Sequence, residues 1–315
     1  MSSFAIQLFQ AMLLILAAPF ATGFVALCKA RLQGRRGASV LQPWRDIRKL
    51  FIKEVVLAEQ ASWLFRSAPY IVFTATIMAA SVVPALLVDT PLSMTADVIA
   101  LVALLALARF FLALAAMDIG TAFGGMGASR EMTFAALAEP AMLMSVFVLS
   151  IGAQSTNLTT MIMHTLNTPI TVQPSIAFAM AAMVMIAVAE NGRIPIDNPT
   201  THLELTMIHE AMLLEYSGRH LALMEWAAQI KLLLFATLLV DLFFPWGIAI
   251  EADVAGILLA VLMWLSKLLV LFVLLAISET VMAKLRMFEV PDYLNTAFIL
   301  AFLGLIIHYM LEVHA

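Results

Sequence analysis

Ionisable residues gather in one short stretch of this chain, between two strongly apolar segments. Between positions 190 and 216 lie Glu190, Arg193, Asp197, His202, Glu204, His209, Glu210, Glu215 and Tyr216. Carboxylates and imidazoles exchange protons near neutral pH when their surroundings disfavour the charged form. Placing charged side chains in an apolar environment costs free energy, so charged residues that persist there usually have a role. We therefore expect this stretch to serve proton exchange or the docking of a partner.

The elements that position this stretch must be membrane helices. The 315 residues are 63% hydrophobic and 12% charged, and their mean hydropathy is +1.00. This composition is far too apolar for a soluble domain and is typical of a polytopic membrane protein. The single cysteine, Cys28, excludes an internal disulfide and a four-thiolate iron–sulfur cluster. We therefore expect any redox centre to lie on a partner chain.

Apolar runs of about twenty residues predict eight transmembrane helices. Their ranges are 4–28, 68–88, 96–117, 132–152, 174–190, 221–245, 254–278 and 294–312. The first run lacks a basic leading region and a small-residue cleavage site, so we interpret it as a retained helix. No internal repeat or low-complexity linker interrupts the chain, and we expect residues 1–315 to form one all-α membrane domain.

Basic residues fix the expected orientation, because they gather on cytoplasmic loops. The loops predicted at 29–67, 118–131, 190–220 and 279–293 contain every Lys and Arg except three that fall inside predicted helices, Arg109, Lys231 and Lys267. Both termini are therefore expected on the non-cytoplasmic side of a bacterial or archaeal cytoplasmic membrane.

The first of these loops contains a short amphipathic helix. Trp44, Ile47 and Phe51 lie three or four residues apart, which places them on one side of a helix with most of the basic residues away from it. Such a helix lies at the membrane interface. Two interpretations follow: the loop rests on anionic lipid, or it is a docking platform for a partner.

Two loops carry a family resemblance. The first reads Gly34-Arg-Arg-Gly37, Leu41-Gln-Pro43, Asp46, Lys49-Leu-Phe51 and Lys53-Glu54, and the later one reads Glu190-x-Gly-Arg193-x-Pro195-x-Asp197, Glu204-Leu205 and Glu215-Tyr-Ser-Gly218. Together with the eight-helix layout, they resemble the quinone-chamber membrane subunit of respiratory complex I. The segments 124–131, 139–140 and 201–210 are more similar to the membrane-anchor subunit of group 4 nickel–iron hydrogenases, the relatives of formate hydrogenlyase and hydrogenase-4. Where complex I relatives have further acidic residues, this chain has Thr200 and His202.

This resemblance implies a non-catalytic subunit that couples electron transfer in its partners to the movement of protons or sodium. It implies an iron–sulfur small subunit and a hydrogenase-like large subunit on the cytoplasmic face, antiporter-like membrane subunits and lipid, but no nucleic acid. The iron–sulfur clusters and a nickel–iron centre would belong to the partners, with no metal or cofactor in this chain. The expected docking residues are Arg35, Arg36, Gln42, Asp46, Lys49, Lys53, Glu54, Arg130, Glu131, Arg193, Asp197, His202 and Tyr216.

Charged residues inside or beside the predicted helices form the expected proton relay. A charge near the bilayer centre costs roughly 3 kcal/mol, so each needs a partner, water or a role. The relay set is Asp118, Glu139, Glu190, Glu225, Lys231 and Lys267. To it the resemblance adds Glu204, Glu210 and Glu215. The alternative is static ion pairing, Arg109 with Glu139 or Glu225 with Lys231.

Several local patterns have plainer interpretations. Asp241 and Glu279 lie near helix ends, where snorkelling or capping is expected. We expect Arg193 to pair with Asp197 across Pro195 in a folded loop. His202 and His209 lack the spacing of a metal site. The glycines from 124 to 127 are expected to form a turn between helices rather than a phosphate loop, since no Lys-Ser/Thr follows them.

Three other functions stay open at this point. A quinone-reducing relative of complex I would form a lipid-accessible chamber at the cytoplasmic ends of its helices. A stand-alone transporter is disfavoured by the absence of internal repeats. A structural anchor with static charges would let electron transfer proceed without any ion gradient.

Overall fold

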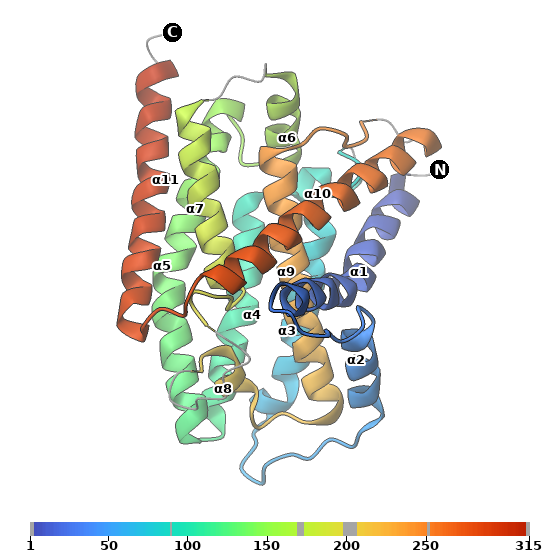
Figure 1. The fold of residues 1–315 in the computed structure, drawn as a ribbon, viewed down its shortest axis with the longest axis vertical. Coiled ribbons are helices and arrows are strands. Elements are labelled where there is room, and N and C mark those ends of the chain that lie inside the picture. Colours follow the sequence, from blue (N-terminus) through green and yellow to red (C-terminus); the bar gives the residue numbers. More distant parts are fainter. Residues whose placement is uncertain (1–2, 89, 169–172, 198–206, 251–252, 313–315) are drawn as a thin grey trace.

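The computed structural model describes residues 3–88, 90–168, 173–197, 207–250 and 253–312 (Figure 1). Within these ranges the chain forms helices and no strand. The α-helices are α1 (Ser3–Leu32), α2 (Gln42–Ile52), α3 (Trp63–Val82), α4 (Val98–Asp118), α5 (Ala122–Ala153), α6 (Leu158–Asn167), α7 (Pro174–Glu190), α8 (His209–Leu213), α9 (Gly218–Phe243), α10 (Val254–Val281) and α11 (Val290–Glu312). Two short 3-10 turns lie at Ser93–Thr95 and Met287–Glu289.

Seven of these helices are long and apolar enough to cross a membrane, namely α1, α3, α4, α5, α9, α10 and the helix that ends the described chain, α11. The helix α7 is apolar but shorter. The chain is thus a multi-pass, all-helical membrane protein in the residues described. Each of the eight predicted apolar ranges overlaps one of these helices, and most of the helices extend beyond the predicted range.

The helix α9 lies at the centre of the bundle. In its most apolar window 78% of the residues are buried, against 28% for both α10 and α11. It packs against α1, α2, α3, α6, α7 and α10. In Figure 1, α5, α7 and α11 stand together on one side, and α10 runs obliquely across the bundle. The oblique helix α10 and the outer helix α11 leave large apolar faces uncovered.

The start of α5 differs from the sequence prediction. Residues 124–127, expected to form a turn, lie inside the helix, which begins after Thr121, whose side chain accepts a hydrogen bond from the Gly124 N–H. A Cβ on Gly124 would lie 2.4 Å from the Ala116 carbonyl oxygen, and one on Gly127 would lie 2.9 Å from the Ile208 carbonyl oxygen. These glycines therefore permit close backbone approach and not a turn.

The helix α2 occupies the first predicted cytoplasmic loop. Its Ile47 is buried, and the helix packs against α9 and α1. The Trp226 ring of α9 makes edge contacts with Trp44, at 5.5 Å between ring centroids, and with Phe51, at 6.4 Å. The aromatic residues of α2 thus anchor it to the central helix, and Arg45, Asp46, Arg48 and Lys49 stay exposed.

Candidate functional site

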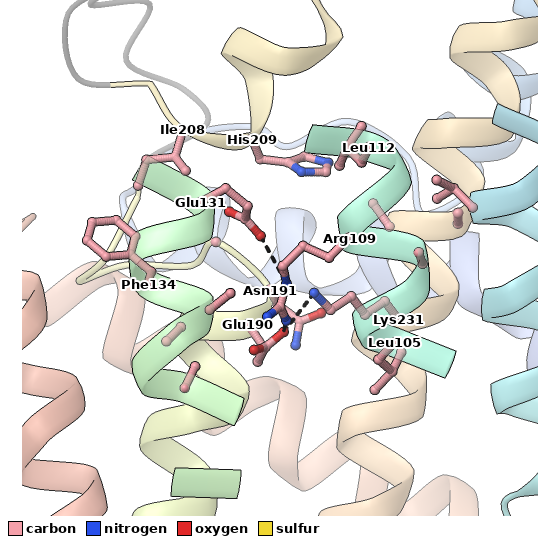
Figure 2. A pocket seen from close by; sticks show the side chains of 18 of the residues that line it. Leu105, Arg109, Leu112, Glu131, Phe134, Glu190, Asn191, Ile208, His209 and Lys231 are labelled. Atoms are coloured by element: carbon pink, nitrogen blue, oxygen red, sulfur yellow. Dashed lines mark hydrogen bonds and ion pairs between the residues drawn. The ribbon is translucent and has the colours of Figure 1, made fainter. Parts of the chain in front are cut away.

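A cavity of about 100 Å³ lies among α4, α5, α7 and α9, next to the segment that leads into α8. Most of its wall is apolar. Its polar lining consists of Thr76, Arg109, Glu131, Glu190, Asn191, His209 and Lys231. In Figure 2, Arg109 and Glu190 point toward each other, Lys231 approaches the same carboxylate, and Glu131 and His209 lie on the other side of Arg109.

Arg109 is the hub of this cavity. It lies within α4, and only 6% of its surface is exposed. Its guanidinium nitrogens reach three carboxylates: Nε lies 3.4 Å from Glu131, Nη1 lies 2.8 Å from Glu139, and Nη2 donates a short hydrogen bond to Glu190. The forked guanidinium has enough donors to hold several carboxylates at once. The ion pair between Arg109 and Glu139 is confirmed, within a larger network than the sequence indicated.

Glu190 joins this network to the central helix. The Lys231 ammonium of α9 lies 2.9 Å from the Glu190 carboxylate, whose side chain is only 5% exposed. Two cations therefore face three carboxylates, and one carboxylate is in excess when all five groups are charged. We call Arg109, Lys231, Glu131, Glu139 and Glu190 the Arg109 cluster. Protonation of one of its carboxylates would balance the charge and rearrange the ion pairs.

Two other predicted relay residues, Glu225 and Lys267, lie outside the Arg109 cluster. Glu225 does not pair with Lys231, because six helical residues turn the two side chains to different sides of α9; its electrostatic neighbours are His209, Glu210 and Asp46. Lys267 donates to the carbonyl oxygens of Phe244 and Trp246 and so caps the end of α9.

Two more relay predictions fall at the edge of the site or beyond it. Asp118 accepts a hydrogen bond of 3.0 Å from the Ser62 N–H, at the start of α3. Glu215 is exposed. Glu204, like the docking candidate His202, lies outside the described residues.

His209 is a further member of this site, and the sequence did not predict it. Its imidazole lines the cavity, and its Nε2 is buried without a hydrogen-bond partner in the described structure. It is also an electrostatic neighbour of Glu225. The sequence signal was present in the adjacent His209-Glu210 pair, but spacing alone could not show that the histidine faces Arg109.

A second ion network ties the segment after α7 to two helix ends. Glu279 of α10 accepts from Lys29 of α1 at 3.1 Å and from Arg193 at 3.3 Å. The predicted clamp between Arg193 and Asp197 is wrong: Asp197 instead contacts Lys284 at 2.7 Å and accepts from the Ile208 N–H. The local turn is held by the backbone, since the Asp197 N–H donates to the Arg193 carbonyl. The two side chains are thereby free to reach opposite partners.

Replacing Glu279 with Gln should destabilise the protein by about 2 to 3 kcal/mol, because two partly buried cations lose their counter-ion. Thermal unfolding of the purified protein in mild detergent measures this. The matched control is Glu59→Gln, since Glu59 is exposed and forms no ion pair in the described structure. Equal melting temperatures for the two variants would show that this network contributes nothing to stability.

Several predicted docking residues contact their own chain. The Arg130 guanidinium donates to the Met207 carbonyl, Glu131 belongs to the Arg109 cluster, and Asp197 is buried. Tyr216 is also buried: its ring stacks on Phe65 at 4.0 Å, and its hydroxyl donates to the Phe65 carbonyl at 3.2 Å. The docking residues that stay exposed are Arg35, Arg36, Asp46, Lys49, Lys53 and Glu54.

Because the Tyr216 side chain is buried, we expect the protein to lose stability at alkaline pH. Burial, and to a lesser degree the Asp118 carboxylate, raise the pKa of Tyr216 above its usual value. The unfolded chain releases this proton near pH of about 10 while the folded chain keeps it, so stability falls as pH rises beyond that point. Tyr216→Phe should cost about 1 kcal/mol at neutral pH through the lost hydrogen bond, and should weaken the alkaline loss. Melting temperatures at pH values on both sides of the transition test this, and an unchanged alkaline slope in the variant would contradict it.

The chain is similar to known proteins over most of its length. The model of the NADH dehydrogenase family matches residues 4–309. Formate hydrogenlyase subunit 4 of Escherichia coli (strain K12) is 34% identical over 299 residues, covering 95% of this chain and 96% of that protein. Hydrogenase-4 component C of the same organism is 37% identical over 281 residues, covering 88% and 87%.

The fold also occurs among solved structures, of which one example follows. It is a chain of the membrane-bound sulfane sulfur reductase, an archaeal respiratory membrane complex, with a TM-score of 0.78 and 18% identity. The match covers 96% of this chain and 99% of the other.

Proposed function

Because this chain belongs to the NADH dehydrogenase family, as its two loop motifs predicted, we propose that it is the membrane subunit that docks a soluble redox module and couples its electron transfer to ion movement. The relatives named for formate hydrogenlyase and hydrogenase-4 favour a group 4 hydrogenase-type complex. On this proposal the iron–sulfur small subunit and the hydrogenase-like large subunit dock on the cytoplasmic side. Antiporter-like subunits lie beside this chain in the membrane and carry the translocated proton or sodium.

The membrane arrangement completes this proposal. The helix α7 has 17 residues and spans about 25 Å at 1.5 Å per residue, close to the thickness of the hydrocarbon core. It packs between α5, α9 and α11. On this proposal α7 is an eighth crossing beside the seven longer helices, and an even number of crossings puts both termini on one side of the membrane. The basic residues of the predicted loops favour the non-cytoplasmic side for the termini and the cytoplasmic interface for α2.

The observation that carries the coupling proposal is the Arg109 cluster. Its excess carboxylate gives the cavity a proton-binding capacity, and His209, which lines the cavity, is an electrostatic neighbour of Glu225, as is Glu210. A charge change in a docked redox centre alters the proton affinity of the nearest acids. Protonation of a cluster carboxylate then loosens its bond to Arg109 and redistributes the ion pairs toward Lys231. No bond of a substrate is made or broken in this chain.

The docking part is tested by purification of the complex through this subunit, with mass spectrometry of the co-purifying chains and assays of nickel and hydrogen evolution. We expect iron–sulfur and hydrogenase-like chains. The double charge reversal Arg35→Glu with Arg36→Glu should strip the soluble chains and leave the membrane chains. The control is Asp253→Lys, an exposed charge reversal at the opposite end of the bundle. Soluble chains retained equally in both variants would contradict this docking surface, and a wild-type subunit without partners would overturn the proposal.

His209 gives a prediction for the coupling part. Gln in its place keeps hydrogen-bonding capacity but cannot titrate near neutral pH, so ion movement per electron should fall severalfold while electron transfer continues. The measurement uses the complex in liposomes with a pH-sensitive dye. His220→Gln is the control, because His220 is buried against Tyr70 and does not line the cavity. Full coupling in the His209 variant would remove His209 from the path.

A further inference from the structure

The surface of α2 is divided into three stripes, because residues three or four apart share one side of a helix. The inward stripe is Trp44, Ile47 and Phe51, which contact the bundle. A second stripe contains Gln42, Asp46 and Lys49, and the Gln42 amide donates to Asp46 at 2.8 Å. The third stripe is Leu41, Arg45, Arg48 and Ile52, all exposed. We call it the arginine stripe.

A groove of about 570 Å³ lies beside the arginine stripe. The stripe forms one wall, and Trp44, Phe51 and Trp226 supply apolar and aromatic surface. Leu41 and Ile52 expose 46% and 76% of their surface, so apolar side chains lie at both ends of the stripe and two guanidinium groups lie between them. A ligand that fits this wall must combine an anionic group with hydrocarbon.

The guanidinium groups of Arg45 and Arg48 have no carboxylate partner in the described part of the chain, so they are available to bind an anion. In the ranges that the structure describes, neither Arg45 nor Arg48 forms an ion pair, whereas Arg109 and Arg193 are both paired. Arg45 and Arg48 lie three residues apart on one helix, so both guanidinium groups can reach the same phosphate. The planar guanidinium can donate two parallel hydrogen bonds to phosphate oxygens.

An apolar track leads from the groove along α1. Phe9, Met12, Leu16 and Phe20 are exposed and recur every three or four residues, so they share one face of that helix. The track ends at the groove, because the Phe20 ring packs against Trp44 with 6.1 Å between centroids. Hydrocarbon chains can continue along this face, while the head group stays at the arginines.

We propose that the groove binds one anionic glycerophospholipid, with its phosphate on Arg45 and Arg48 and its acyl chains along the α1 track. The lipid fastens α2 to α1 and α9 at the membrane surface. This site is separate from the Arg109 cluster and from the second stripe, which contains the docking residues Gln42, Asp46 and Lys49. The proposal does not depend on the coupling mechanism.

The test is native mass spectrometry of the full-length subunit, purified in mild detergent with its complex and supplied with phosphatidylglycerol or phosphatidylcholine. Wild type should retain one phosphatidylglycerol in preference to phosphatidylcholine. The variant Arg45→Gln with Arg48→Gln should retain it at least about tenfold less, since each basic residue near the surface contributes appreciably to anionic lipid binding. Arg66→Gln is the matched control, because it removes one exposed guanidinium charge from α3, away from the groove. All substitutions are on the surface, and gel filtration verifies that each variant is folded.

A second variant tests the track independently of the charges. Phe20→Ser should lower lipid retention and leave the preference for the anionic head group unchanged. Equal retention of phosphatidylglycerol by wild type and the double arginine variant would overturn the proposal. So would recovery of a quinone in place of phospholipid, or a cross-link from position 45 to a partner chain that covers the groove.

Discussion

Replacing Arg109 with Gln is expected to remove most of the folded subunit from the membrane. The substitution leaves three carboxylates around a cavity from which their shared cation is gone, and Glu190 keeps only Lys231. Breaking a buried ion pair by removing one partner costs about 3 to 5 kcal/mol, a large fraction of the stability of a typical domain. The measurement is the amount of subunit in the membrane fraction together with its melting temperature in detergent.

Two further variants identify charge as the cause. Arg109→Lys should recover part of the stability, because an ammonium restores the charge but cannot reach three carboxylates in fork geometry. Adding Glu190→Gln to the Gln variant should also recover part of it by removing one uncompensated charge. If Arg109→Gln matched wild type in abundance and melting temperature, the Arg109 cluster would not be holding the bundle together.

The second large effect is expected from Lys231→Met, and it concerns coupling rather than folding. Glu190 keeps its bond to Arg109 in this variant, so the subunit should assemble. The ion pair that joins the Arg109 cluster to α9 is lost, and we expect ion movement per electron to fall by about a hundredfold or more, which is the typical contribution of a positioned proton-transfer group. Electron transfer in the soluble module should continue, and both rates are measured on the complex in liposomes.

Lys231→Arg is the conservative partner of this experiment and should retain most coupling. Lys267→Met offers a sharper contrast, because the sequence placed both lysines in one relay, while the structure puts Lys267 at the carbonyl oxygens that end α9. We expect it to lower stability and not coupling. Uncoupling by the Lys267 variant with full coupling in the Lys231 variant would contradict the path proposed through the Arg109 cluster.

The positions of the apolar helices could be predicted from the sequence because an apolar run of about twenty residues is typical of a transmembrane helix. Their ends were less predictable. The glycine run after 124 is typical of a turn, yet the chain uses it inside α5, where the Ala116 and Ile208 carbonyl oxygens come too close for a Cβ. Such close approaches depend on tertiary contacts and leave no trace in local sequence.

Most residues of the charged site could be predicted from the sequence, but which of them form ion pairs with one another could not. Glu139, Glu190 and Lys231 were expected to act together, and the structure brings them around Arg109. Glu131 was assigned to docking, since nothing in its neighbourhood shows that it faces α4. Arg193 and Asp197 are four residues apart and were expected to pair with each other. Instead, Arg193 pairs with Glu279 and Asp197 pairs with Lys284, each more than 80 residues away in the sequence.

The most direct test of the central claim is infrared difference spectroscopy of the purified complex between its oxidised and reduced states. The account predicts a protonated-carboxyl band that appears on reduction, shifts in D₂O and disappears in Glu131→Gln or Glu139→Gln, but persists in Glu59→Gln. Identical difference spectra in wild type and in both cluster variants, with ion movement intact, would show that the Arg109 cluster takes no part in coupling.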